Sequence, residues 1–152
     1  MQPHYGHLVR VLHSCTDQAM NAALEQMDLT AAQGRILSYL AHCTEPVCPK
    51  DVEKRFRLSH PTVSGILSRL EQKGFVDLLS DENDRRCKRI RILPKGEECH
   101  QKIHEAIAQN EEQLVRHFSE SEQEQFRQLL SRAIANMGPS PCYPISKEEP
   151  TK

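Results

Sequence analysis

The chain has 152 residues, 38% of them hydrophobic, and a formal net charge of −1, which fits a single compact domain. No apolar run approaches the roughly 18 residues of a membrane span, and His4, His7 and Arg10 interrupt any signal-peptide core, so we expect a cytoplasmic protein. With 6 glycines, no phosphate-binding glycine loop and no nucleophile elbow, the sequence does not predict an enzyme.

The first part of the chain predicts two helices. Residues 4–26 carry apolar side chains along one helical face, and this helix should end before Asp28. Thr30 can then cap a second helix over residues 31–42. The inward-facing residues of the second helix are Ile36, Leu37 and Leu40.

The next segment predicts a helix-turn-helix. Pro49 opens a short helix, and a tight turn at Leu58 and Ser59 leads into a second helix that begins near His60. Ser59 is a side-chain acceptor for free N–H groups, and Gly74 is expected to end the helix in a left-handed conformation.

This second helix has two different faces. Apolar residues at helical spacing, namely Val63, Ile66, Leu67 and Leu70, form a buried stripe, and the opposite face is small, polar and basic. In a helix-turn-helix the second helix lies in the DNA major groove with its N-terminal residues facing the bases. We therefore expect Thr62, Ser64 and Gly65 to approach base edges.

A β-hairpin wing is predicted directly afterwards. Residues 75–79 and 88–93 read as short strands, the second with cationic Arg89 and Arg91 alternating with apolar neighbours. The polar segment between them is turn-like and carries Arg85 and Arg86. The fold class is therefore mainly α with a small β-hairpin wing, a winged helix-turn-helix.

Basic charge is concentrated in this region. Residues 50–95 contain 12 Lys or Arg against 7 Asp or Glu, a net of +5, while the remaining residues carry 8 against 14, a net of −6. Cationic side chains that neutralise phosphates make binding salt-dependent. The alternative, a basic face that is merely solvated, is disfavoured by the ordered series of elements around it.

The flanking helices predict a dimerisation region. Residues 96–118 read as a long polar helix, and Ser119 with Glu122 resembles a capping box before an amphipathic helix that ends near Met137. Terminal helices with one apolar face need a partner, so pairing in a homodimer is expected, the alternative being packing within the monomer. Residues 138–152 read as a flexible tail. The predicted boundaries are a single domain over 1–137, with dimerisation helices over 1–28 and 97–137 and a DNA-binding lobe over 29–96.

These motifs, taken in order, closely resemble the MarR family of bacterial and archaeal transcription regulators. The resemblance covers about residues 25–100 and rests on Leu29-Thr30-Ala31-Ala32-Gln33, Ile36-Leu37-Ser38-Tyr39-Leu40, Ser59-His60-Pro61-Thr62-Val63-Ser64, Arg69-Leu70-Glu71-Gln72-Lys73-Gly74-Phe75-Val76, Asp84-Arg85-Arg86 and Pro94-Lys95-Gly96. It implies a homodimer that binds a short inverted repeat in double-stranded DNA, most often as a repressor relieved by a small molecule, an oxidant or a metal.

The resemblance also implies roles for single residues. Ser59 and Arg69 fall at expected backbone contacts, Asp84 orients an arginine, and Arg85 or Arg86 reaches into the minor groove. Gly65 has no side chain, so specificity should rest on other positions. The full predicted DNA-binding set is Ser59, Pro61, Thr62, Ser64, Gly65, Ser68, Arg69, Lys73, Asp84, Arg85, Arg86 and Lys88.

The place of an effector site is expected from layout only. The cleft between the dimerisation helices and the DNA-binding lobe would be lined by His13, Cys15 and Tyr39. Two alternatives to the DNA-binding repressor stay open: a winged-helix module that binds another protein, and a metal-sensing regulator that uses Cys and His.

Six cysteines and eight histidines invite sharper hypotheses. Cys15 could sense oxidants, Cys43 and Cys48 could form a reversible bridge, and Cys99 with His100 and His104 has metal-compatible spacing. The remaining cysteines are Cys87 and Cys142. Inert thiols and imidazoles are the favoured interpretation, so we expect no cofactor and no metal.

Overall fold

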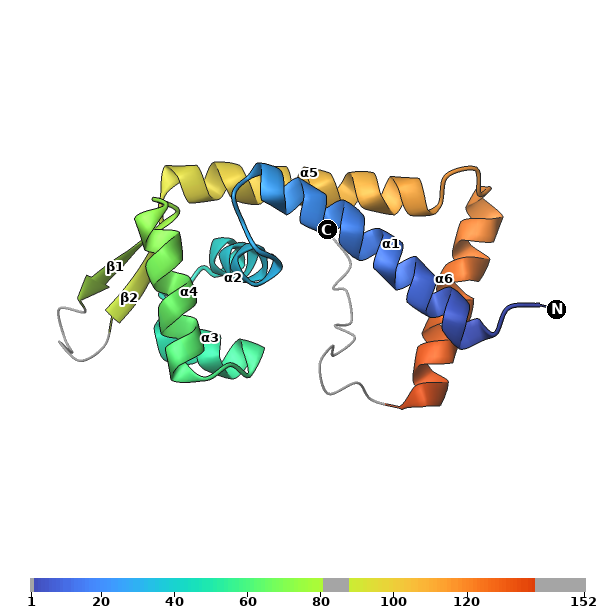
Figure 1. Cartoon of the computed structure of the whole chain (residues 1–152), viewed down its shortest axis with the longest axis horizontal. Coiled ribbons are helices and arrows are strands. Elements are labelled where there is room, and N and C mark those ends of the chain that lie inside the picture. Colours follow the sequence, from blue (N-terminus) through green and yellow to red (C-terminus); the bar gives the residue numbers. More distant parts are fainter. Residues whose placement is uncertain (1, 81–87, 139–152) are drawn as a thin grey trace. The chain divides into compact units, whose positions relative to one another are not determined.

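The computed structural model describes residues 2–80 and 88–138, and the chain divides into two compact units, residues 1–114 and 115–152. The elements are α1 (Tyr5–Gln26), α2 (Ala31–His42), α3 (Pro49–Phe56), α4 (His60–Gln72), β1 (Val76–Ser80), β2 (Lys88–Ile92), α5 (Pro94–Leu114) and α6 (Glu120–Met137). Figure 1 shows the helices and the single hairpin. The predicted fold class, mainly α with a β-hairpin wing, is confirmed.

The helix starts follow the caps expected from the sequence. Thr30 Oγ1 accepts a hydrogen bond from the Gln33 backbone N–H at 3.3 Å, and Gln33 Oε1 accepts the Thr30 N–H at 3.1 Å, which is a capping box. The Ser59 hydroxyl caps α4 by accepting the Thr62 backbone N–H, and Ser119 with Glu122 forms the predicted capping box of α6. Local side-chain chemistry therefore defines these boundaries.

Each helix of the helix-turn-helix is followed by a left-handed residue. Arg57 follows α3 with φ of 53°, and Gly74 follows α4 with φ of 76°. Beyond Gly74, the Phe75 N–H donates to the Leu70 carbonyl at 2.9 Å and closes the helix end. Gly74 confirms the predicted stop, whereas the left-handed Arg57 was not predicted, because an arginine gives no indication of positive φ.

The wing strands pair antiparallel, with Val76 opposite Ile92 and Ser80 opposite Lys88. Ile90 is buried and its neighbours Arg89 and Arg91 are exposed, so the predicted alternation is confirmed. The Ile90 N–H also donates to the Val47 carbonyl at 2.8 Å. This bridge attaches the segment before α3 to the wing.

The core lies within the first unit, where α2, α4 and α5 meet the base of the wing. Leu37, Val52, Val63 and Leu70 are fully buried. At Gly96, near the start of α5, an added Cβ would collide with the Phe75 carbonyl oxygen. The glycine thus lets α5 begin directly against the chain that follows α4.

The predicted helix over 96–118 has different bounds in the structure. Pro94 already opens α5, since its missing N–H costs nothing in the first turn, and α5 ends at Leu114. Beyond it, His117 is left-handed with φ of 69°, and the Phe118 ring packs edge-on against Phe126 with ring centroids 5.7 Å apart. Phe118 therefore belongs to the second unit and not to α5.

Apolar side chains remain exposed on the first and last helices. On α1, Tyr5 is 88% and Val9 60% exposed, and on α6, Leu129 is 60% and Met137 89% exposed. α6 has no buried residue. Within the described residues, no helix has the length and apolar character to cross a membrane.

Candidate nucleic-acid interface

The exposed face of α4 presents the residues predicted to approach DNA bases. Thr62, Ser64 and Gly65 are exposed, while Val63 and Leu67 of the same helix are buried in the core. Pro61 and Arg69 are also exposed and Ser68 is half-buried. The core contacts fix the rotation of α4, so its polar face is presented as a rigid surface.

The start of α4 is held by hydrogen bonds between its own first residues and by a contact with α3. The hydroxyls of Ser59 and Thr62 share a hydrogen bond of 2.8 Å, and the Ser59 hydroxyl accepts the Thr62 N–H at 3.4 Å. His60 Nδ1 lies 2.7 Å from the Glu53 carboxylate on α3. His60 is therefore a positioning residue of the helix-turn-helix, and its partner seven residues earlier could not be predicted from helical spacing.

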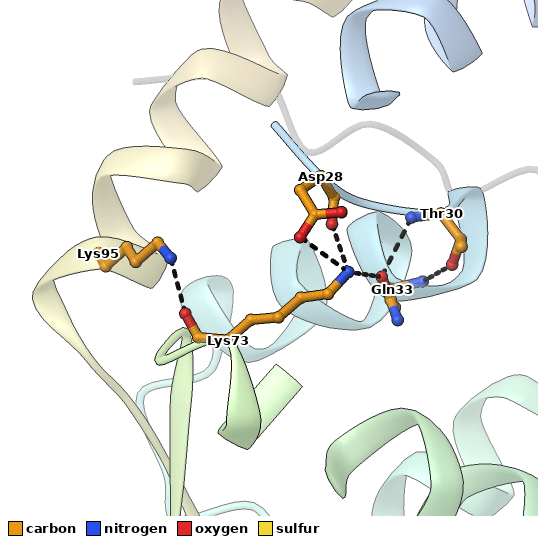
Figure 2. Close-up of polar contacts among 5 residues, drawn as sticks. All are labelled: Asp28, Thr30, Gln33, Lys73 and Lys95. Atoms are coloured by element: carbon orange, nitrogen blue, oxygen red, sulfur yellow. Dashed lines mark hydrogen bonds and ion pairs between the residues drawn. The ribbon is translucent and has the colours of Figure 1, made fainter. Parts of the chain in front are cut away.

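Lys73 takes part in contacts inside the first unit. Its Nζ donates to the Asp28 carbonyl at 2.6 Å and to Gln33 Oε1 at 3.5 Å, and the Asp28 carboxylate lies 3.3 Å away (Figure 2). The Lys95 ammonium in turn donates to the Lys73 carbonyl at 2.7 Å. Lys73 was predicted in the DNA-binding set. In the structure its ammonium joins the end of α4 to Asp28 and to Gln33 in the first turn of α2, and its contact with DNA stays a prediction.

The base of the wing is anchored by two polar contacts. Arg91 Nη2 lies 2.7 Å from the carboxylate of Asp77 on the paired strand, and Glu71 on α4 accepts the Leu78 N–H at 3.1 Å. Lys88 is exposed where β2 begins. The predicted contacts at Asp84, Arg85 and Arg86 lie outside the described residues.

The residues proposed for an effector pocket lie on α1 and α2. His13 and Cys15 are exposed, and His13 Nε2 lies 3.3 Å from Asp17 on its own helix. Tyr39 packs edge-on against Phe56 at 5.6 Å, and burial together with neighbouring Cys43 raises its pKa. Among the described residues, no hydrogen bond, ion pair or ring contact joins His13 or Cys15 to Tyr39. The pocket stays a prediction.

The described cysteines are free thiols, so Cys43 and Cys48 are not bridged. Burial, reinforced by the Asp51 carboxylate, raises the pKa of the Cys48 thiol. Burial also raises the pKa of Cys99, whose Sγ lies 3.6 Å from Met27 Sδ. Both shifts disfavour the reactive thiolate. Cys87 and Cys142 lie outside the described residues.

The predicted grouping of Cys99 with two histidines is changed by the structure. Cys99 faces the core, and His100 and His104 instead meet His42 from the end of α2. Sequence spacing identified the pair on α5 but not the third histidine, which is far away in sequence.

A short helix, a left-handed turn, a second helix with an exposed polar face and an antiparallel hairpin together define a winged helix-turn-helix. The sequence profile of the MarR family matches residues 27–86. The multiple antibiotic resistance protein MarR of Escherichia coli K12 is 26% identical over 133 residues, which cover 85% of this chain and 90% of that protein. The transcriptional regulator PecS of Dickeya dadantii is 28% identical over 118 residues, covering 76% and 71%.

A solved structure also resembles this chain in fold and sequence. A single-residue mutant of MepR from Staphylococcus aureus, bound to an oligodeoxyribonucleotide, is 30% identical, with a TM-score of 0.72 over 90% of this chain and 99% of that one. The chain belongs to the MarR family.

Proposed function

We propose that this MarR-family transcriptional regulator acts as a homodimeric repressor on an inverted-repeat operator and is relieved by a small molecule or an oxidant. The observation that carries the DNA-binding part is the capped helix α4, whose polar face is exposed beside a basic wing strand. A helix N-terminus with free N–H groups also favours nearby phosphates. We place this activity in the cytoplasm, where the chromosome is accessible.

In this proposal α4 enters the major groove. Thr62 and Ser64 contact base edges, whereas Ser59 and Arg69 contact the DNA backbone and set the register. Gly65 faces open space, since no described residue outside its own stretch of α4 lies within 4 Å of the position that a Cβ would take. Its role would be to allow close approach of the helix to the groove.

The exposed apolar residues of α1 and α6 support the homodimer. Tyr5, Val9, Leu129 and Met137 would each leave water if a second copy covered these helices. Burial of such surface contributes about 25 cal/mol per Å². Two copies related by a twofold axis would present two α4 helices to the two halves of an inverted repeat.

Relief of repression then requires an effector that binds one spacing of the two α4 helices better than another. A ligand without such a preference leaves the DNA affinity unchanged, however tightly it binds. This condition applies equally to a small molecule and to oxidation of an exposed thiol such as Cys15.

The experiment is a quantitative mobility shift with purified protein, operator DNA and two variants. Arg86→Ala should weaken binding to every sequence, because it removes a minor-groove cation, and Ser64→Ala should alter base preference more than overall affinity. Unchanged binding by both variants would contradict the proposed contacts. A protein-binding winged helix would show neither base preference nor a steep loss of DNA binding with salt.

A further inference from the structure

Three histidines from two helices meet in the first unit. His42 is the last residue of α2, while His100 and His104 lie one turn apart on α5. One ligand nitrogen from each of the three lies within 4.8 Å of the others. The ring centroids are 4.5 to 5.3 Å apart. These residues are called the tri-histidine cluster below.

We infer that the tri-histidine cluster binds a divalent first-row transition metal of the zinc class and thereby links α2 to α5. Imidazole nitrogen is a preferred ligand of Zn²⁺ and of its neighbours Co²⁺, Ni²⁺ and Cu²⁺. Metal–nitrogen bonds of about 2.0–2.1 Å in tetrahedral geometry place the nitrogens roughly 3.3 Å apart. The three ligand nitrogens therefore need to move only a short distance toward one another.

The side chains are free to make that movement. His42 and His104 are exposed and His100 is half-buried, so side-chain rotations at the surface can bring the rings closer without moving the core. No carboxylate has to be displaced, since none belongs to the cluster among the described residues.

His42 is already oriented as a metal ligand. Its Nδ1 lies 2.7 Å from the Ser38 carbonyl oxygen. Because a carbonyl can only accept, Nδ1 carries the proton and Nε2 keeps its lone pair. Metal-bound histidines are commonly held in this way, with the second nitrogen donating to a backbone carbonyl.

His100 supplies an independent observation. Its Nδ1 is buried and has no hydrogen-bond partner within the described part of the chain. Buried polar atoms are rarely left unpaired, and an orphaned one indicates a missing partner such as an ion.

The coordination would be open on one side. An open cavity of about 410 Å³ lies beside His100 and is lined also by Ala41, Glu97 and Gln101. Three protein ligands with access to solvent leave a fourth position for water. Cys99 is not a ligand, because its sulfur is buried against Met27 on the core side of α5.

Metal binding would bear on regulation, and this part rests on the proposed function. α2 contributes Ile36 and Leu37 to the core of the DNA-binding lobe, and α5 continues from the wing. A metal held by both helices favours one angle between them. It would therefore shift DNA affinity by its preference for that angle.

The test uses untagged, metal-stripped, full-length protein at pH 7. Isothermal titration with Zn²⁺ should give one saturable site per chain, and Co²⁺ should give visible absorption bands of a low-symmetry site. His42→Ala removes a direct ligand. It should weaken Zn²⁺ binding by at least about 10- to 100-fold, the loss in metal affinity that follows when only a hydrogen-bond partner of a ligand is removed. His104→Ala, at an exposed position, should do the same.

Two control variants separate the cluster from other candidates. His7→Ala removes an exposed histidine on α1, and Cys99→Ala removes the thiol adjacent to His100; both should bind Zn²⁺ as the unmodified protein does. Metal-free circular dichroism melts show whether each variant is folded. Unchanged affinity in folded His42→Ala, or the absence of a saturable site, would overturn the proposal.

A second arm separates the metal site from its coupling to DNA. The operator affinity should change with Zn²⁺ in the unmodified protein and not in His42→Ala. Tight Zn²⁺ binding with unchanged operator affinity would overturn the coupling while the metal site stands. Zn²⁺ binding by a protein that selects no DNA would instead refute the proposed function.

Discussion

Replacement of Gly65 by alanine should raise stability, whereas the larger glutamate at the same position should weaken operator binding. Gly65 lies in the interior of α4 and is exposed, and among the described residues no atom outside its own stretch of helix lies within 4 Å of the position that a Cβ would take. A glycine inside a helix costs about 0.8–1.0 kcal/mol relative to alanine, and no clash offsets this gain. The melting temperature of Gly65→Ala should therefore rise by about 2–4 °C.

Gly65→Glu should also fold, because glutamate is a good helix former and the position is open. In the proposed complex, however, it brings a negative charge into the major groove of each half-site. We expect operator affinity to fall at least about tenfold, which corresponds to roughly 1.4 kcal/mol. Thermal melts and fluorescence anisotropy with labelled operator measure the two effects on the same samples.

Ala31 provides the control position, since it is exposed at the first residue of α2 and lies outside the proposed DNA contacts and the proposed dimer helices. Ala31→Glu should leave operator affinity unchanged. If Gly65→Glu bound DNA as tightly as the control, α4 would not enter the groove by this face. A loss of stability in Gly65→Ala would instead show that another residue packs against Gly65.

Three further predictions follow from single contacts. Gly96→Ala should lower the free energy of unfolding by about 1–3 kcal/mol in urea titrations, because the new Cβ meets a backbone carbonyl; a neutral effect would contradict that packing. Lys73→Met should lower the free energy of unfolding by about 1 kcal/mol but leave the slope of log affinity for DNA against log salt concentration unchanged. Arg69→Met should instead reduce this slope by about one per half-site. Equal slopes in the two variants would contradict the different roles of Lys73 and Arg69. Hydrogen bonds from Cys48 hold the pKa of Asp51 below its usual range, so its stabilisation is present at neutral pH and is lost as the pH falls below about 4. Asp51→Asn should therefore flatten the acid side of the stability profile, and an unchanged profile would argue against this contact.

Local chemistry made α4 predictable in full. The cap at Ser59, the proline in the first turn and the left-handed Gly74 act within a few residues of each other, and the structure places the helix at His60–Gln72 between them. The wing strands were predictable for the same reason, because alternation along β2 reports directly on which side chains are buried.

Contacts between elements distant in sequence were not predictable. Lys73 reads as one more cation on a basic helix until the fold brings Asp28 beside it, 45 residues away. His42 likewise joins His100 only because α2 packs against α5. A periodic pattern identifies the face that an element buries, but it does not identify the neighbour.

The most direct test of the central claim is selection of binding sites from a random double-stranded DNA library, followed by anisotropy titrations at two salt concentrations. The account predicts enrichment of an inverted repeat with half-sites one helical turn apart, bound by two chains with an affinity that falls steeply as salt rises. Failure to enrich any sequence, or binding that is insensitive to salt, would contradict it.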